Sequence, residues 1–349
     1  MHMVVVGVDP HKHSHTAVAV DSNGRELGQI TVGNTAAELI RLLEWAQRWP
    51  GSRRWAVEDC RHVAGSLLRA LLGTGQAVVT VPPKLMARAR ASARTRGKSD
   101  PIDAPAVARA ALREPDLPEA HLDEQALQIR LLLDHREDLV AERTRMINRL
   151  GWHLHDLEVA LPRGQALNRI TTLNRLREQI GRLAGGVRAE IAAELIERII
   201  TVTRRVGQLK RRIEAQVQPL VPHLLAIPGC GGLTAAKVLA ETAGVDRFRS
   251  SAAFAMHAGT APIPVWAGNR ARFRLNRGGN RQFNAALHRI AVTQLRIHRP
   301  AQALVQRRTA AGNSKTEALR VLRRHLADVV YHRLRADTGS PGTCHPEAG

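Results

Sequence analysis

The spacing of apolar residues changes near residue 124, and this change restricts the chain to a mixed architecture. Before it, short β-branched runs such as MVVVGVD (3–9) alternate with segments of helical spacing, which is typical of a sheet with helices packed on it. After it, apolar residues recur every three or four positions through long charged stretches, which indicates helices. The expected fold class is therefore α/β followed by α.

The first ~85 residues are expected to form four strands and two helices. The strands are predicted at 3–9, 15–21, 53–59 and 76–83, and the helices at 35–48 and 63–72. The first two strands are interpreted as a hairpin, and the turn residues Ser22-Asn23-Gly24 follow them. Thr35 with Glu38 three residues later predicts a capping box at the start of the first helix.

A long charged arm is expected from 124 to 217. Helical spacing runs through 127–157 and again through 187–217, and Pro162 and Gly164 separate the two stretches. We interpret them as an antiparallel helical pair or a coiled-coil arm. Long charged helices of this kind are usually arms or dimer seams that carry no chemistry of their own.

The remaining sequence predicts a compact, mainly helical domain followed by a disordered tail. Its helices are expected at 233–243, 250–258, 280–297 and 315–334. The predicted domains are therefore 1–123, 124–217, 218–335 and a tail at 336–349.

The charge of the chain points to a polyanionic partner. Lys and Arg number 52 against 31 Asp and Glu, which gives a formal net charge of +21. A protein this basic most often binds nucleic acid, with ribosomal-type structural binding as the plain alternative. No apolar run reaches the ~18 residues of a membrane span, and the start of the chain lacks the features of a signal peptide. Three widely spaced cysteines, Cys60, Cys230 and Cys344, fit a reducing cytoplasm.

Four acids form a candidate metal site. Asp9 ends the first predicted strand and Glu58 ends the third, with Asp59 beside it as an alternative. Asp100 and Asp103 are three residues apart at a helix start, so they share one helix face. Such acids can converge on two Mg²⁺ or Mn²⁺ ions that hold the attacking and leaving oxygens of a phosphodiester. Any one of them alone is better explained as a solvated residue at the end of a strand.

Three basic or glycine-rich segments are candidates for nucleic-acid binding. The first carries Arg88, Arg90, Arg94, Arg96 and Lys98. The second, around Gly229 and Gly231, resembles a helix-hairpin-helix, although a plain tight turn explains it equally well. In the third, a Pro-rich loop leads into Arg270, Arg272, Arg274 and Arg277, and then Gly278-Gly279-Asn280-Arg281 opens a helix. Basic side chains before a helix N-terminus can hold phosphates.

Histidine and cysteine chemistry is not favoured. His11, His13 and His15 alternate and could bind a transition metal, but no fourth ligand is evident, so a polar turn beside the acids is the better interpretation. None of the three cysteines has a base partner in the sequence, which argues against a thiol nucleophile.

Several of these segments together resemble a known family. The segments VVVGVDPHKHSHTAVAVD, WAVED and KSDPIDA are similar to the DEDD, RuvC-like domain of insertion sequence 110 transposases. The segments IPGCGGLTAAKVLAE and RLNRGGNRQFNAALHRIA are similar to the C-terminal transposase domain of that family. The resemblance covers about residues 3–335.

The resemblance implies a bridge-RNA-guided DNA recombinase of a bacterial insertion sequence. It implies a RuvC-like RNase H fold, a coiled-coil arm and a helical transposase domain, with Asp9, Glu58, Asp100 and Asp103 as the DEDD acids. It further implies that a structured guide RNA, the bridge RNA, pairs with donor and target double-stranded DNA on a homodimer that assembles to a tetramer. The expected location is the bacterial cytoplasm, at the nucleoid.

The chain departs from this family at one position. The family uses a serine after GTAPIP as the nucleophile that forms a phosphoserine link to DNA, and position 267 here is alanine. Ala267 has no hydroxyl, so the chain is expected to bind DNA without recombining it, whether the alanine is natural or introduced. Ser250 and Ser251 precede a predicted helix, where capping explains them.

Two other functions are kept open. One is a RuvC-like metal-dependent nuclease or resolvase that uses the four acids alone. The other is a noncatalytic protein that binds RNA or DNA. A covalent protein–DNA product separates recombinase from nuclease, and loss of all Mg²⁺ dependence would favour the noncatalytic protein.

Overall fold

The computed structural model describes most of the chain in two compact units. The described residues are 3–58, 65–81, 85–86, 100–114, 117, 119–120, 123–160, 162, 164–183, 185–267, 270–276 and 278–339. The first unit comprises Met1–Asp123 and Ala243–Gly279, and the second comprises Glu124–Thr242 and Asn280–Gly349. Residues 243–279 thus belong to the same unit as the N-terminal sheet.

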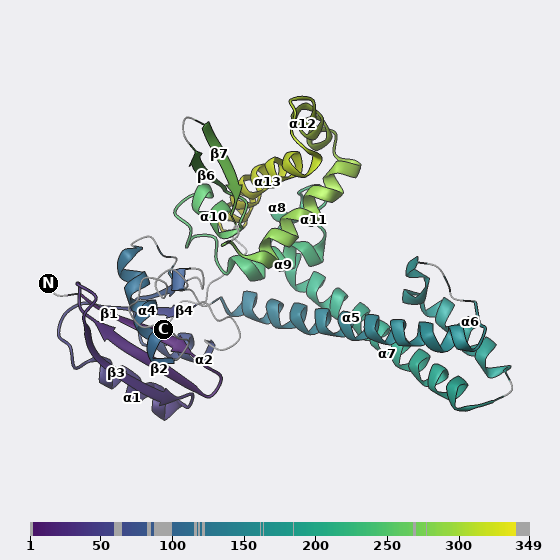
Figure 1. Ribbon diagram of the computed structural model, residues 1–349, viewed down its shortest axis with the longest axis horizontal. Coiled ribbons are helices and arrows are strands. Elements are labelled where there is room, and N and C mark those ends of the chain that lie inside the picture. Colours follow the sequence, from purple (N-terminus) through teal and green to yellow (C-terminus); the bar gives the residue numbers. More distant parts are fainter. Residues whose placement is uncertain are drawn as a thin grey trace. The chain divides into compact units, whose positions relative to one another are not determined.

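A five-stranded sheet is the core of the first unit (Figure 1). Its strands are β1 (Val4–Pro10), β2 (Ser14–Val20), β3 (Glu26–Gly33), β4 (Arg53–Glu58) and β5 (Val78–Val81), in the order β3-β2-β1-β4-β5. The first three strands form an antiparallel meander, and β4 and β5 extend it in parallel with β1. The expected α/β class is confirmed.

Helices cover both faces of the sheet. On one face, Val6, Val8 and Trp55 pack with residues of α1 (Ala36–Ala46) and α2 (Gly65–Gly73). On the other face, Val5 and Ala56 pack with α4 (Asp100–Arg113). Since successive residues of a strand point to opposite faces and helices cover both, both sides of β1 are buried, and Asp9 is its one charged residue.

The sequence pattern missed one strand of this sheet. The hairpin of β1 and β2 formed as predicted, but the Ser22-Asn23-Gly24 turn leads into β3, which pairs with β2. The exposed and intermediate burial of most of β3 explains the miss, because an edge strand needs few apolar residues.

The capping box at the first helix is only half formed. The Thr35 hydroxyl accepts a bond from the Glu38 N–H at 3.4 Å. The Glu38 carboxylate instead accepts from the Gly33 N–H at 3.1 Å, so it links α1 to the end of β3.

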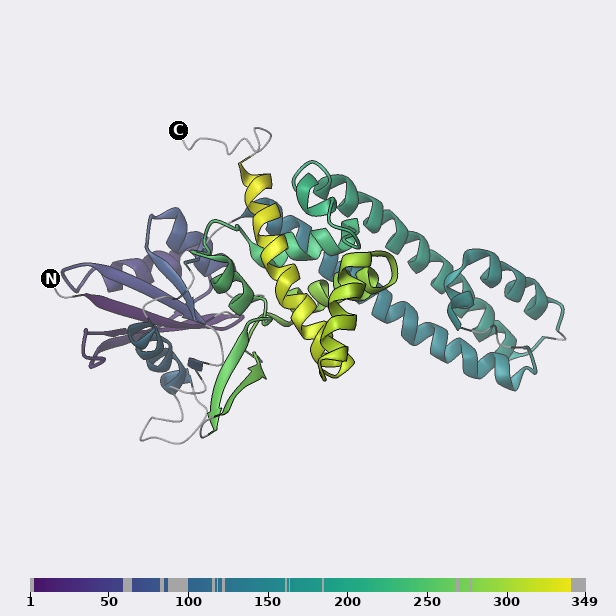
Figure 2. The ribbon, with the colours of Figure 1, turned by 90° about the horizontal axis from the view of Figure 1, so that it is seen from above.

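Two long helices form the arm in the second unit. They are α5 (Glu124–Asp156) and α7 (Val187–Val217), and they lie side by side in Figures 1 and 2. The helical pair is as predicted, but the stretch between its halves also holds η1 (Gly164–Asn168) and α6 (Ile170–Gly181). Residues of α6 such as Leu173 and Leu176 are buried against Leu150 and Ile196 of the pair.

The remaining predicted helices of the second unit formed, and two further helices are present. The second unit also contains α8 (Pro222–Leu225), α9 (Gly232–Thr242), α11 (Arg281–Ile297), α12 (Arg299–Ala310) and α13 (Lys315–Thr338). The sequence did not indicate α12. Asp337 joins the end of α13 to α8, because its carboxylate accepts from the N–H groups of His223 and Leu224 at 2.8 and 3.1 Å.

The Pro-rich segment expected as a loop is a β-hairpin. It follows α10 (Ser251–His257) in the first unit and consists of β6 (Pro262–Ala267) and β7 (Arg270–Leu275). Prolines are tolerated here because a two-stranded ribbon has two edges, where a missing N–H need not break a ladder. Ser250 caps α10, as expected, by accepting from the Ala253 N–H at 3.2 Å.

Candidate active site and nucleic-acid interface

Two of the predicted acids follow neighbouring positions of parallel strands. In the β1–β4 pairing, Val8 lies beside Val57, and Asp9 and Glu58 are the next residues along the two strands. Asp9 is only 4% exposed. The carboxyl ends of adjacent parallel strands therefore bring these two acids to one edge of the sheet.

The N-terminal part of α4 lies over the same face. A Cβ added at Gly7 would lie 2.4 Å from the Ala108 nitrogen and 2.5 Å from the Ala104 oxygen, so α4 approaches the backbone of β1 closely there. Alternation along the strand puts Asp9, two residues after Gly7, on the face that α4 covers. Asp103 directly precedes Ala104 and is 8% exposed. Three predicted acids thus share one face of the sheet.

The structure does not complete the predicted cluster. Among the residues that the structure describes, no group of three or more His, Cys, Asp and Glu side chains is arranged to hold a metal ion. Asp100 begins α4, but its side chain lies outside the described part of the structure. The donors at Asp9, Glu58 and Asp103 are carboxylate oxygens, which suit Mg²⁺ or Mn²⁺.

The three alternating histidines have separate surroundings. The His11 Nε2 lies 3.3 Å from the Asp9 Oδ2, at the candidate site. His15 is fully buried, its Nε2 lies 3.1 Å from the Asn34 Oδ1, and burial lowers its pKa, so it stays neutral. The predicted polar turn beside the acids is confirmed for His11, but it is wrong for His15, which lies buried on β2.

Cys230 is unsuited to nucleophilic chemistry, as the sequence indicated. Burial raises the pKa of its thiol to about 12, so the thiolate is essentially absent at neutral pH.

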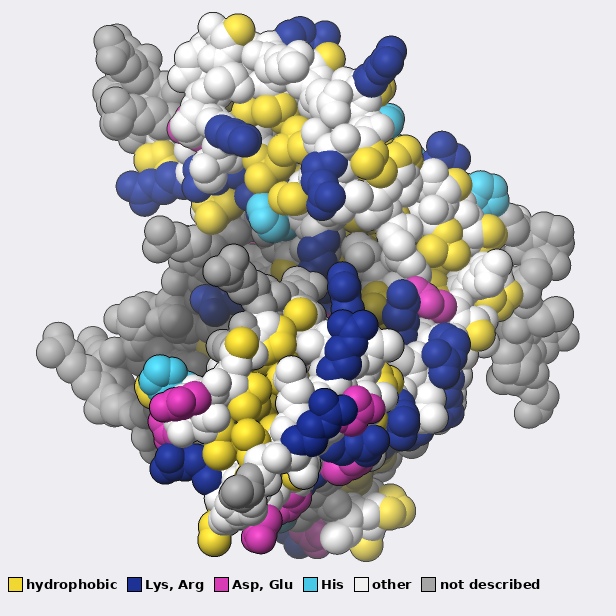
Figure 3. All heavy atoms as spheres, turned by 90° about the vertical axis from the view of Figure 1, so that its right-hand side faces the viewer, with side chains coloured by type: hydrophobic (Ala, Val, Ile, Leu, Met, Phe, Trp, Pro, Cys, Tyr) yellow, Lys and Arg dark blue, Asp and Glu magenta, His cyan; other side chains and the backbone are white. Residues whose placement is uncertain are grey.

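The predicted basic residues have mixed outcomes. The segment with Arg88, Arg90, Arg94, Arg96 and Lys98 lies outside the described residues, as does Arg277. Arg270 and Arg272 lie on β7, but their side chains are not described, whereas Arg274 is exposed. Arg281 is exposed at the first position of α11. Figure 3 shows that Lys and Arg side chains are more prominent than Asp and Glu on the face drawn.

Neighbouring atoms crowd one glycine of the turn before α9 and leave another glycine accessible. Gly229 has φ +83°, which favours glycine, and a Cβ there would lie 3.0 Å from the Thr293 Cβ. Gly231 has nothing within 4 Å of such a Cβ, so the backbone is open beside it. A phosphate could therefore approach the turn at Gly231 more readily than at Gly229.

The position of the expected nucleophile is at the tip of the hairpin. Ala267 is the last residue of β6 and pairs with Arg270, the first residue of β7. The hairpin belongs to the same compact unit as Asp9 and Asp103.

Comparison with known proteins identifies the family of this chain. A DEDD transposase profile of the insertion sequence 110 type matches residues 6–159, and a profile described as transposase IS116/IS110/IS902 family matches residues 221–306. The chain belongs to the IS110 family of transposases. The first profile includes the sheet except for the first two residues of β1, and it includes all four predicted acids, whereas the second includes the hairpin and α11.

Relatives of this transposase match along nearly the whole chain. A protein of insertion element IS116 from Streptomyces clavuligerus is 28% identical, over 95% of this chain and 94% of its own. A protein of insertion element IS900 from Mycobacterium paratuberculosis is 25% identical, over 95% and 96%. Two Thermus thermophilus RuvC structures, one in complex with a Holliday junction, cover 34% of this chain at 20% identity and a TM-score of 0.27.

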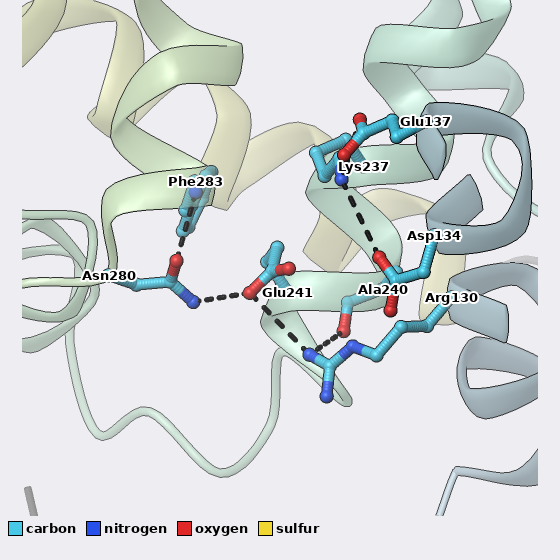
Figure 4. Close-up of polar contacts among 8 residues, drawn as sticks. All are labelled: Arg130, Asp134, Glu137, Lys237, Ala240, Glu241, Asn280 and Phe283. Atoms are coloured by element: carbon cyan, nitrogen blue, oxygen red, sulfur yellow. Dashed lines mark hydrogen bonds and ion pairs between the residues drawn. The ribbon is translucent and has the colours of Figure 1, made fainter. Parts of the chain in front are cut away.

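A buried polar network in the second unit of the transposase positions the start of α11 (Figure 4). The Asn280 side chain caps α11 by accepting from the Phe283 N–H at 3.0 Å, and its Nδ2 donates to the Glu241 carboxylate at 2.6 Å. Arg130 on α5 donates to the Ala240 carbonyl at 2.7 Å and lies 3.5 Å from the Glu241 carboxylate. Arg281 is thereby held at the first turn of α11.

The neighbouring lysine of α9 is also buried. The Lys237 Nζ lies 2.9 Å from the Glu137 Oε1 and 4.0 Å from the Asp134 Oδ1, both on α5. Lys237 and Glu241 are 3% and 5% exposed. They are four residues apart, so the sequence alone would place them on an exposed charged face.

We expect Glu241→Ala to lower the free energy of unfolding of the second unit by about 3 kcal/mol, because it leaves the half-buried Arg130 and the buried Asn280 without their carboxylate. Urea denaturation followed by circular dichroism measures this change. The matched control is Glu194→Ala, which removes an exposed pair with Arg198 at 3.6 Å and should cost less than about 0.5 kcal/mol. Equal losses for the two variants would contradict the proposed role of the network.

No described helix has the length and apolar character needed to cross a membrane.

Proposed function

We propose that this transposase is built as a recombinase of donor and target DNA that is guided by a structured bridge RNA, and that the joining step is lost in this chain. The proposal assigns a RuvC-like domain to 1–123, a coiled-coil arm to 124–217 and a transposase domain to 218–335. It also assigns the family's nucleophile position to residue 267, where alanine makes the chain a binding form that does not recombine DNA. A homodimer that assembles to a tetramer on DNA completes the proposal, with action at the bacterial nucleoid.

The observation that carries the proposal is the shared face of the acids. Asp9 and Glu58 follow the registered pair Val8 and Val57, and Asp103 lies on the helix that covers that face. With Asp100 they would hold Mg²⁺ or Mn²⁺, and such ions polarise a phosphodiester and stabilise its attacking and leaving oxygens.

The inclusion of residues 243–279 in the first unit supports the nucleophile assignment. The hairpin that ends at position 267 and the strands that carry the acids belong to one compact unit of the chain. A nucleophile and the metals that polarise its target phosphate must act on the same phosphorus atom, so the hairpin and the acids must meet, either within one chain or between the chains of the homodimer.

Two alternative functions would differ from this proposal in what happens to the DNA. A RuvC-like nuclease or resolvase that uses the acids alone would cut DNA without forming a covalent link to protein. A noncatalytic binding protein would do neither and would not depend on Mg²⁺. Sequencing the nucleic acid that copurifies with the transposase tests the RNA-guided proposal directly, and a defined structured RNA enriched over bulk cellular RNA is the expected result.

We expect nucleic-acid binding to be dominated by phosphate contacts. The net charge of +21 predicts that the logarithm of the affinity for duplex DNA falls linearly with the logarithm of salt, with a slope of about −0.9 for each phosphate neutralised. Fluorescence anisotropy over a salt series measures the slope. Arg281→Gln at the start of α11 should make the slope shallower by about one phosphate. A flat salt response would rule out this mode of binding.

A further inference from the structure

The described residues of the β6–β7 hairpin include an exposed apolar face. In its register Pro262 lies beside Leu275, and Pro264 lies beside Phe273. Because side chains alternate along strands, these four residues share one face. All four are exposed, with Phe273 at 68% and Leu275 at 44%.

The apolar face continues at the base of the hairpin. The Asn276 Nδ2, one residue past β7, donates to the Met256 carbonyl at 2.9 Å, which places Met256 beside the ribbon. Met256 is itself 46% exposed. A clustered apolar surface of this kind is typical of an interaction site, whereas a single exposed apolar residue needs no explanation.

The charge around the hairpin indicates what kind of partner binds to its apolar face. Arginines at 270, 272 and 274 alternate with the apolar residues along β7. No Asp or Glu occurs from Arg247 to Thr316, so the hairpin lies within an acid-free and arginine-rich stretch. A nucleic acid offers both complements at once, since its phosphates attract arginine and its bases present flat apolar surfaces to an aromatic ring.

We propose that this hairpin binds nucleic acid at a place where bases are unpaired. Phe273 stacks on an unpaired base, and Arg274, on the opposite face of the same strand, contacts the adjoining phosphates. A two-stranded ribbon is narrow enough to enter a duplex groove, but a base inside a duplex stacks on its neighbours and has no face free for Phe273. The inference rests on the proposed function and specifies which part of the nucleic acid the hairpin recognises.

The test measures the affinity of the full chain for two labelled hairpin oligonucleotides, one fully paired and one with a short bulge of unpaired nucleotides. Each is made as DNA and as RNA, so that the two sources of unpaired bases are compared. Phe273→Ala should weaken binding to the bulged probe by about 5- to 150-fold and leave the paired probe nearly unchanged. The ratio of the affinity for the bulged probe to the affinity for the paired probe is measured for DNA and for RNA. The larger ratio identifies the nucleic acid whose unpaired bases the hairpin prefers.

Matched variants separate stacking from other effects. Phe273→Trp should keep the preference for the bulge, whereas Phe273→Leu should lose it, because leucine is apolar but has no aromatic face. Leu275→Ala, on the same face, should change the ratio of bulged to paired affinity by less than about threefold. The loss of a stacked base would change it by at least about fivefold, which corresponds to ~1 kcal/mol. Arg274→Gln should weaken all probes to a similar extent and reduce the salt slope by about one phosphate.

Distinct results would overturn the inference. Equal loss on bulged and paired probes in Phe273→Ala, or full retention of the preference in Phe273→Leu, would exclude stacking. A shift of the protein alone to smaller oligomers in Phe273→Ala, measured by gel filtration, would show that a second copy covers the face. If the unmodified chain bound none of the probes, the proposed function itself would fail.

Discussion

Replacing Ala267 with serine is expected to convert the transposase from a chain that only binds DNA into one that recombines it. The serine Oγ would attack phosphorus, the bond from phosphorus to a sugar oxygen would break, and that oxygen would leave with a proton as a hydroxyl group. The phosphoserine keeps the energy of the phosphodiester bond for rejoining. With cognate RNA and both DNA substrates, Ala267→Ser should yield recombinant DNA and an adduct that survives denaturing electrophoresis.

Controls for this prediction come from the candidate metal site. Asp100→Asn in the Ala267→Ser background should abolish strand exchange but not folding, because removal of one charge from a cluster of acids relieves repulsion. EDTA should have the same effect as this substitution. An adduct formed by the chain with Ala267 intact, or an inactive Ala267→Ser complex that assembles fully, would show that the nucleophile is elsewhere, and Ser251 would then be tested first.

Gly7→Ala is expected to destabilise the first unit strongly. The new Cβ would lie 2.4 Å from the Ala108 nitrogen and 2.5 Å from the Ala104 oxygen, which are backbone atoms that cannot rotate away. The helix α4 would have to shift off the sheet, and we expect a loss of about 3 kcal/mol, the upper end for overpacked cores. Because α4 carries Asp103, metal-dependent activity in the Ala267→Ser background should fall as well.

Gly73→Ala is the matched control for this variant. Gly73 ends α2 in the same unit, and a Cβ there would meet nothing within 4 Å. Its substitution should be neutral or stabilise the unit by up to about 1 kcal/mol, since alanine restricts the unfolded chain more than glycine does. Thermal unfolding of the two variants measures the difference. Similar midpoints for the two would show that α4 does not pack tightly over β1.

Much of the candidate site could be predicted from local sequence. Asp9 and Glu58 follow β-branched or apolar runs, and Asp100 and Asp103 stand at the start of a predicted helix, so each acid could be placed at the end of an element. The helix start at Asn280 could be predicted because Gly-Gly-Asn before an amphipathic stretch is a strong capping signal. These are short-range properties, which depend on neighbouring residues alone.

The hairpin shows where local pattern fails. Two prolines in β6 argue against a strand in the interior of a sheet, so the segment was expected to be a loop. Pairing with β7 decides the outcome, because the register puts Pro262 and Pro264 opposite Leu275 and Phe273 on one exposed face. The edge strand β3 was missed for a related reason, since its identity depends on hydrogen bonds to β2 rather than on apolar spacing.

Composition and periodicity are properties of the chain alone, and they are enough to predict the classes of element, the basic character of the chain and the residues available for chemistry. The tertiary structure determines which acids share a face. It leaves no room for a side chain at residue 7 where α4 packs on β1, and it buries Lys237 and Glu241. It also decided that residues 243–279 join the N-terminal sheet in one unit. Each of these depends on contacts between segments distant in sequence, whose packing and strand pairing no local pattern encodes.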